Sequence, residues 1–159
     1  MSNEIAGDVK EIRAVDISSK MIEIAKLKAE KRNIENIEYA QTSLFDEGYP
    51  PGSFDVILAF YILHLVDDAP EVMQRIHALL KPGGLMISAT PCMGEMSFQR
   101  FLLALLSKFG LVPKIRPFKS DDLEGLITTG NLEIIDKECL QKSTAQYFFV
   151  AKKLPLQGF

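Results

Sequence analysis

Residues 54–61, Phe-Asp-Val-Ile-Leu-Ala-Phe-Tyr, form an apolar run with one charged residue. Such a run, without alternation between apolar and polar residues, is typical of a strand covered on both faces, as in a parallel sheet. Pro50-Pro51-Gly52 before it predicts a loop, because two prolines offer no amide to a sheet. After it, Asp67 or Asp68 predicts a helix start, with Pro70 in the first turn. The segment therefore predicts a strand-to-helix unit of an α/β domain.

The alternation of strand and helix continues in both directions. Upstream, strands are predicted at 11–16 and 37–41, with a helix between them that Ser18 or Ser19 caps and Asn33 ends. Downstream, Lys81-Pro82-Gly83-Gly84 predicts the end of the helix that begins near Asp67, and 85–90 predicts the next strand.

The remaining elements complete the pattern. Apolar residues at three-four spacing predict a helix over 98–109 that Gly110 ends, and a short helix runs from Ser120 or Asp121 to Gly130. Strands at 133–140 and 145–152 have no helix between them, so they predict an antiparallel hairpin. The order predicts a three-layer α/β fold with a mostly parallel sheet.

Size and composition narrow the class further. The chain has 159 residues and a formal charge of −3, which predicts one domain over 1–159 and argues against nucleic-acid binding through bulk positive charge. Its apolar runs are too short to predict a membrane span. Cys92 and Cys139, without a CxxC pair or a histidine cluster, predict reduced thiols in a cytoplasmic protein and no metal site.

Three motifs in order carry a family resemblance. Val15-Asp16-Ile17-Ser18, Gly52-Ser53-Phe54-Asp55-Val56-Ile57 and Leu79-Leu80-Lys81-Pro82-Gly83-Gly84-Leu85 resemble the second strand, the fourth strand and the turn into the fifth strand of class I S-adenosylmethionine-dependent methyltransferases. The closing hairpin fits that family too. The resemblance covers 9–153 and implies a Rossmann-like sheet with S-adenosylmethionine as cofactor. It also implies the strand order third, second, first, fourth, fifth, seventh, sixth.

The resemblance implies a set of cofactor-binding residues. Asp16 would accept hydrogen bonds from both ribose hydroxyls, as acids at this place do in dinucleotide folds. Ile17 and Met21 would contact the adenine ring, although Met21 is an equally good core residue. Phe60 and Tyr61 would border the methionine part of the cofactor, with packing under a helix as the alternative.

Two further parts of the predicted site each have more than one interpretation. Ser43 and Leu44 stand where the family commonly has an acid and its neighbour, which bind the adenine; Asp46 is the alternative to Ser43. His64 is the candidate general base, because imidazole titrates near neutrality. Many methyl transfers need only proximity and alignment, so a base is not required.

The resemblance also has a gap. The family's first strand and glycine-rich turn should precede Asp16, but only 1–12 is available and no G-x-G pattern occurs. The sequence therefore predicts an N-terminally incomplete, truncated domain whose first central strand is missing. Unpaired strand edges are costly, so we expect 11–16 and 54–60 to pair directly in parallel, and self-association through these edges.

Two function classes follow from these observations. The first is an enzyme, an S-adenosylmethionine-dependent methyltransferase that acts on a small, apolar acceptor and not on nucleic acid or a membrane. The acidic pI and the absence of an Asn/Asp-Pro-Pro-aromatic turn after residues 54–60 argue against a nucleobase substrate. The second is a non-catalytic methyltransferase-like module or fragment that does not bind the cofactor tightly.

Overall fold

The computed structural model describes residues 2–92, 118–141 and 145–155. The chain divides into two compact units, Met1–Gly48 and Tyr49–Phe159, which we describe separately. The organisation as one domain over 1–159 stays a prediction, and the helix predicted over 98–109 lies outside the described residues. Within those residues, no helix combines the length and the apolar character that crossing a membrane requires.

The N-terminal unit contains two short helices, a longer helix and two parallel strands. These are α1 (Ser2–Ile5), η1 (Ala6–Asp8), β1 (Ile12–Val15), α2 (Ser19–Glu30) and β2 (Ile37–Ala40). Ser18 is the N-cap of α2, as predicted, and its hydroxyl accepts a hydrogen bond from the Met21 amide at 3.4 Å. Asn33 has a φ of 53°, a left-handed conformation that asparagine tolerates at the end of a helix.

Side-chain hydrogen bonds fasten the start of this unit to β2. The Asn36 amide donates to the carbonyl oxygens of Ala6 at 2.7 Å and Val9 at 2.9 Å. The Tyr39 hydroxyl donates to the side-chain oxygen of Asn3 at 2.8 Å, and burial raises the pKa of Tyr39. These bonds hold η1 and the residues after it beside the strand pair.

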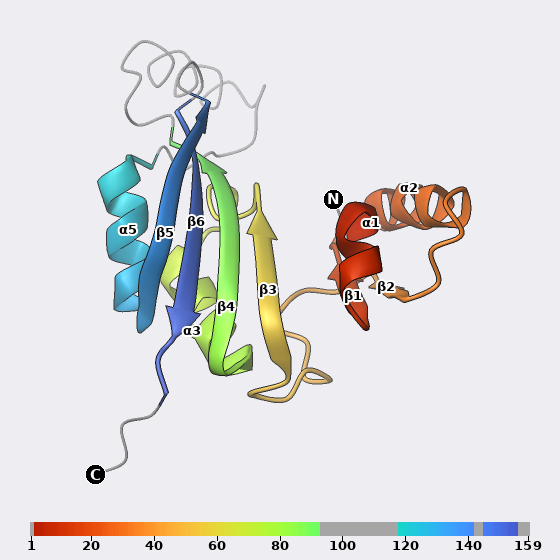
Figure 1. Ribbon diagram of the computed structural model, residues 1–159, viewed down its shortest axis with the longest axis horizontal. Helices are drawn as coiled ribbons and strands as arrows, with labels where there is room; N and C mark the ends of the chain where they lie inside the picture. Colours follow the sequence, from red (N-terminus) through yellow and green to blue (C-terminus); the bar gives the residue numbers. More distant parts are fainter. Residues whose placement is uncertain (1, 93–117, 142–144, 156–159) are drawn as a thin grey trace. The chain divides into compact units, whose positions relative to one another are not determined.

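The described residues of the C-terminal unit form a four-stranded mixed sheet with two helices (Figure 1). Its elements are β3 (Phe54–Phe60), α3 (Ala69–Leu79), β4 (Leu80–Pro91), α5 (Ser120–Thr129), β5 (Leu132–Gln141) and β6 (Gln146–Lys153). The strand order is β3-β4-β6-β5, where β3 and β4 are parallel and β6 is antiparallel to both neighbours. The predicted hairpin is confirmed, and so is the predicted order of these four strands.

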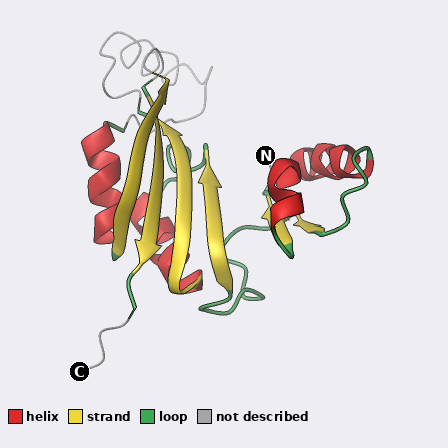
Figure 2. Cartoon of the chain, in the orientation of Figure 1, coloured by secondary structure: helices red, strands yellow, loops and turns green. Residues whose placement is uncertain are grey.

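One face of the sheet carries the core of this unit. Figure 2 shows α3 and α5 on the same side of the strands. Alternate residues of β4 and β6 are fully buried, which places them on one face, as the two-residue period of a strand requires. The helices contribute the apolar residues of their inner faces. The core residues are Met86, Ser88, Thr90, Phe149, Ala151, Val72, Met73, Ile76, Leu79, Leu123 and Ile127.

The junction between α3 and β4 differs from the prediction. The helix ends at Leu79 and the strand begins at Leu80, so Lys81-Pro82-Gly83-Gly84 lies inside β4 rather than before it. Leu80 pairs with Phe54, and the register shifts before the next pair, Val56 with Leu85. A Cβ at Gly84 would meet the carbonyl oxygens of Lys81 at 2.9 Å and Asp55 at 3.0 Å, so glycine permits this close approach.

The direct pairing predicted between 11–16 and 54–60 concerns residues of different units and stays a prediction. Strand β1 pairs with β2 in the N-terminal unit, and strand β3 pairs with β4 in the C-terminal unit. In the part of the chain that the structure describes, each unit therefore has a sheet of its own. The fold class, an α/β chain with a mixed sheet, is confirmed.

Candidate functional site

Asp16 lies directly after the carboxyl end of β1, as predicted. Its amide donates to the carbonyl oxygen of Ala40 at 3.3 Å, which continues the β1–β2 ladder by one bond. Its carboxylate oxygen Oδ1 accepts a hydrogen bond from the Ser18 amide at 2.8 Å. This bond fixes the carboxylate at the start of α2 and leaves acceptor capacity on both oxygens, because an ionised carboxylate has about four acceptor sites.

Two large apolar side chains stand in solvent beside this carboxylate. Ile17 is 79% exposed and Met21 is 53% exposed. The Ile17 carbonyl accepts a hydrogen bond from the Gln41 side chain at 3.3 Å, which ties the segment to the end of β2. Met21 is therefore not a core residue of the N-terminal unit, and of its two readings the apolar contact surface is the one that its exposure favours.

The loop after β2 is organised around Asp46. Its Oδ2 accepts from the Thr42 hydroxyl at 2.7 Å, and its Oδ1 accepts from the Gly48 amide at 2.8 Å. The Ser43 hydroxyl oxygen accepts from the Phe45 amide at 3.2 Å, and Leu44 lies between them in the chain. Both oxygens of Asp46 thus hold the loop, and the Ser43 hydroxyl takes part in it as well, so Ser43 and Asp46 both stay candidates for the adenine contact.

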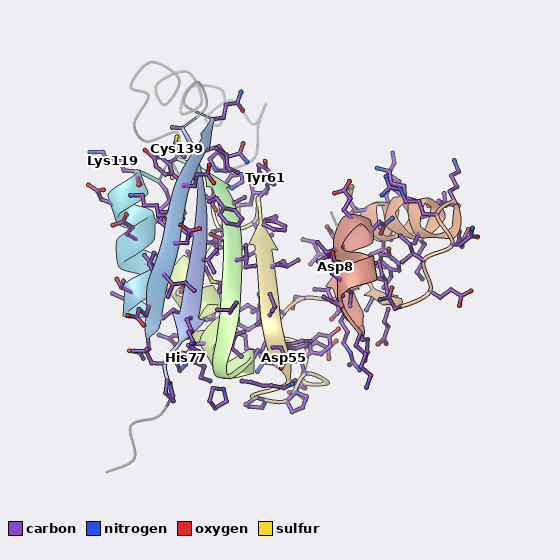
Figure 3. All side chains as sticks on the ribbon, in the orientation of Figure 1. Asp8, Asp55, Tyr61, His77, Lys119 and Cys139 are labelled. Carbon is purple, nitrogen blue, oxygen red and sulfur yellow. The ribbon has the colours of Figure 1, made fainter. Side chains whose placement is uncertain are left out.

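Phe60 is the last residue of β3 in the C-terminal unit, and Tyr61 follows it (Figure 3 labels Tyr61). Phe60 pairs with Ala89 of β4, and the Tyr61 amide donates to the Ala89 carbonyl at 2.9 Å. Tyr61 has a φ of 56°, and its side chain is 43% exposed. Its hydroxyl oxygen accepts a hydrogen bond from the Gln146 side chain.

His64 lies in the turn after β3 and is buried. Its Nδ1 has no hydrogen-bond partner, and burial lowers the pKa of the imidazole. A buried histidine with a lowered pKa is neutral near pH 7 and keeps a free lone pair, so it is in the form that accepts a proton. The second histidine, His77, lies on α3, where burial and the charge of Lys153 lower its pKa.

The predicted residues thus fall into two groups, one in each unit. Asp16, Ile17, Met21, Ser43 and Leu44 belong to the N-terminal unit, and Phe60, Tyr61 and His64 belong to the C-terminal unit. Sequence reasoning missed Gln146, because a glutamine at the start of a strand has no pattern that distinguishes it from a solvated residue. Among the described residues, no group of three or more His, Cys, Asp or Glu side chains could hold a metal ion.

Comparison with known proteins identifies relatives of this chain. A family model described as a methyltransferase domain matches residues 2–141. A demethylmenaquinone methyltransferase of Lactococcus lactis subsp. lactis (strain IL1403) is 34% identical over 85 residues, which are 54% of this chain and 34% of that protein. A ubiquinone biosynthesis O-methyltransferase of Bradyrhizobium sp. (strain ORS 278) is 39% identical over 96 residues, 60% of this chain and 36% of the relative.

The solved structures agree in fold. A SAM-dependent methyltransferase from Methanosarcina mazei superposes with a TM-score of 0.78 at 17% identity, over 98% of this chain and 87% of that one. At this identity the likeness shows the shared Rossmann-like fold. The matched region of this chain spans about a third of the length of the two curated relatives.

Proposed function

The chain belongs to the methyltransferase domain family, and from this premise we propose that it binds S-adenosylmethionine and takes part in methyl transfer to a small, apolar acceptor. The observation that carries the proposal is the Asp16 carboxylate, fixed by the Ser18 amide, with the exposed side chains of Ile17 and Met21 beside it. A carboxylate next to bare apolar surface suits a ribose joined to an adenine ring.

The residues present fit the cofactor in chemical terms. Asp16 would accept hydrogen bonds from the ribose hydroxyls, and Ile17 and Met21 would contact the adenine ring. The Ser43 hydroxyl or the Asp46 carboxylate would bind the ring edge together with the Leu44 backbone. Phe60 and Tyr61 belong to the C-terminal unit, and their contact with the methionine part stays a prediction. When bound, the cofactor supplies a methyl group on a positively charged sulfur.

The protein's contribution to the reaction is placement. A sulfonium is already activated, so holding the acceptor in line with the methyl group supplies most of what the transfer needs. Where the acceptor loses a proton, the neutral imidazole of His64 could take it at Nδ1, whose burial would first have to be relieved. The role of His64 stays a hypothesis, and a pH–rate profile of a His64→Gln variant tests it.

The names of the relatives point to a chemical class for the methyl acceptor. One curated relative is named as a methyltransferase of demethylmenaquinone, and the other as an O-methyltransferase of ubiquinone biosynthesis. We therefore propose an aromatic acceptor of quinone or quinol type. Such a ring is small and largely apolar, in agreement with the acceptor that the sequence predicts.

Calorimetric titration with S-adenosylmethionine and S-adenosylhomocysteine tests the proposal. We expect binding by the wild-type chain, and a loss of affinity of about 10-fold to 100-fold in Asp16→Asn, because a charge-assisted hydrogen bond becomes a neutral one. The asparagine keeps an oxygen for the Ser18 amide, so the local fold is retained. Asp8→Asn, an exposed acid of the same unit, is the matched control. Equal affinity in Asp16→Asn and wild type would contradict the assignment.

The alternative is a non-catalytic module. Its motivation is that β1 and β3 each pair on one side only, within separate sheets. A chain that binds neither cofactor form, while remaining folded by circular dichroism, would favour the module. The same titration therefore separates the two candidates.

A further inference from the structure

We propose that Gln146 is a positioning residue that fixes the Tyr61 side chain, and that the Tyr61 hydroxyl donates a hydrogen bond to an oxygen atom of the methyl acceptor. The inference rests on the proposed function and deepens it by naming what the acceptor must carry. It concerns residues of the C-terminal unit alone.

The first observation is backbone conformation. Four residues other than glycine have a positive φ in the described part of the chain: Asn33, Tyr61, Asn131 and Ala145. Two of them are asparagines, which adopt this conformation readily. Tyr61 at 56° and Ala145 at 45° lack the short polar side chain that makes this conformation easy for asparagine. Backbone held in this region is strained and tends to occur at functional sites.

The second observation is that Tyr61 and Ala145 lie at the same end of the strands of this sheet. Tyr61 follows β3, and its amide donates to Ala89 near the carboxyl end of β4. Ala145 precedes β6, and its carbonyl accepts from the Cys92 amide at 2.8 Å, just beyond the end of β4. In α/β sheets, ligands bind at the carboxyl ends of the parallel strands, and Tyr61 and Ala145 lie at that end of β3 and β4.

The third observation joins the two segments. Gln146 pairs with Pro91 of β4, and its side-chain amide Nε2 donates to the hydroxyl oxygen of Tyr61. The hydrogen bond thus spans from the start of β6 to the end of β3, across the end of β4. A tyrosine with this second anchor loses rotamer freedom before any ligand arrives, which lowers the entropic cost of binding.

The direction of this bond decides the chemistry. Because the Tyr61 oxygen accepts from Gln146, the proton of the hydroxyl is not used by that bond. The side chain is 43% exposed, so the proton can be donated to a bound molecule. An apolar ring with one outward donor suits a flat acceptor that carries a carbonyl, phenol or ether oxygen. A purely hydrocarbon acceptor would leave this donor unpaired.

Two probes of equal shape test the proposal, 1-naphthol and 1-methylnaphthalene, which differ by a hydroxyl in place of a methyl group. Both fluoresce, and the chain has no tryptophan to interfere. Their dissociation constants are measured by fluorescence titration, with and without S-adenosylhomocysteine. We expect Tyr61→Phe to lower the preference for 1-naphthol by about 3-fold to 10-fold, the effect of one neutral hydrogen bond.

Gln146→Leu should lower the preference in the same direction, and the double variant should lose no more than Tyr61→Phe alone, because the two residues act as one unit. Gln74→Leu, an exposed glutamine of α3, is the matched control and should leave the preference unchanged. A merely structural role of Gln146 would weaken both probes equally, and that result would overturn the inference.

The remaining outcomes of the experiment each contradict either this inference or the proposed function. An unchanged preference in Tyr61→Phe, or no measurable binding of either probe to the wild-type chain, overturns the inference. Failure of S-adenosylhomocysteine to bind, with the probe preference still dependent on Tyr61, instead contradicts the proposed function and leaves the recognition of an oxygen-bearing ring in place.

Discussion

The ammonium group of Lys153, the last residue of β6, donates to the carbonyl oxygen of His77 at 2.7 Å and to that of Leu80 at 2.8 Å. Both carbonyls lie at the C-terminal end of α3, where backbone oxygens lack helical partners and the helix dipole favours a positive charge. A strand residue therefore caps a helix that lies 76 positions earlier in the chain.

Lys153→Met should destabilise the protein. The substitution keeps most of the aliphatic stem and removes both charge-assisted bonds, so we expect the free energy of unfolding to fall by about 1–3 kcal/mol in urea denaturation. Lys152→Met, one residue earlier and exposed, should change it by no more than about 0.5 kcal/mol. In NMR titrations the pKa of His77 should rise in Lys153→Met, because the lysine charge contributes to its lowering.

Two glycine substitutions should act in opposite directions. Gly84→Ala places a Cβ against the Lys81 and Asp55 carbonyls, so we expect a loss of about 1–3 kcal/mol. Gly125 lies inside α5 with open space around it, so Gly125→Ala should stabilise by about 1 kcal/mol through helix propensity. Thermal denaturation of both variants measures this, and destabilisation by Gly125→Ala would show that the space at α5 is filled.

Stability should fall as the pH is lowered below neutrality. His64 and His77 are the two histidines of the chain, and burial lowers the pKa of each, with Lys153 contributing at His77. The unfolded chain then binds protons that the folded chain does not. The stability that the neutral forms provide is complete above about pH 6.5 and is lost as the pH falls through the lowered folded values.

Urea titrations between pH 7.5 and 5.5, chosen to span the reference value of about 6.5, measure this dependence. His64→Gln and His77→Gln should each flatten the curve, and the double variant should remove most of the slope in this range. A free energy of unfolding that rises towards pH 5.5 would contradict the lowered values.

The two cysteines should differ in reactivity. Cys139 is exposed on β5, whereas Cys92 is buried at the end of β4. We expect a thiol reagent to label one cysteine rapidly in the native protein and the second only in denaturant. Cys139→Ser should abolish the rapid phase, and a rapid phase that survives this substitution would mean that the end of β4 opens.

The outer position of β3 in the four-stranded sheet should promote self-association. The opposite edge strand, β5, carries two register irregularities and the charged run Asp136-Lys137-Glu138, features that discourage pairing with another chain. In β3 only Asp55 is charged, and Val56 is exposed. Sedimentation velocity should therefore show concentration-dependent association that Val56→Lys reduces and Ile135→Lys on β5 does not.

Much of the fold could be predicted from local signals. The apolar run at 54–61, the Asp68 cap and the Gly130 stop each act within a few residues, and the structure confirms the strand and both helix ends. The start of β4 was misplaced, because the pairing of Leu80 with Phe54 overrides the breaker residues Pro82 and Gly83. The parallel pairing of β1 with β2 agrees with the strand order that the resemblance implies, third beside second, although no local pattern encodes it.

The candidate site divides in the same way. Asp16 and Tyr61 could be placed from their positions at strand ends, because topology fixes what lies there. The residues that surround or hydrogen-bond to the site residues could not be predicted from the sequence. The hydrogen bond from Gln146 to Tyr61 joins residues 85 positions apart. The exposure of Met21 depends on the tertiary packing of α2, which a local sequence pattern does not give.

The position of β6 between β4 and β5 bears on synthesis at the ribosome. As the chain emerges, β4 and β5 are both complete before β6 exists, and β5 has no other neighbour in the sheet. The nascent chain therefore carries two open hydrogen-bonding edges that only a later segment can join. Until that segment leaves the exit tunnel, these edges are open to pairing with other chains and to chaperones.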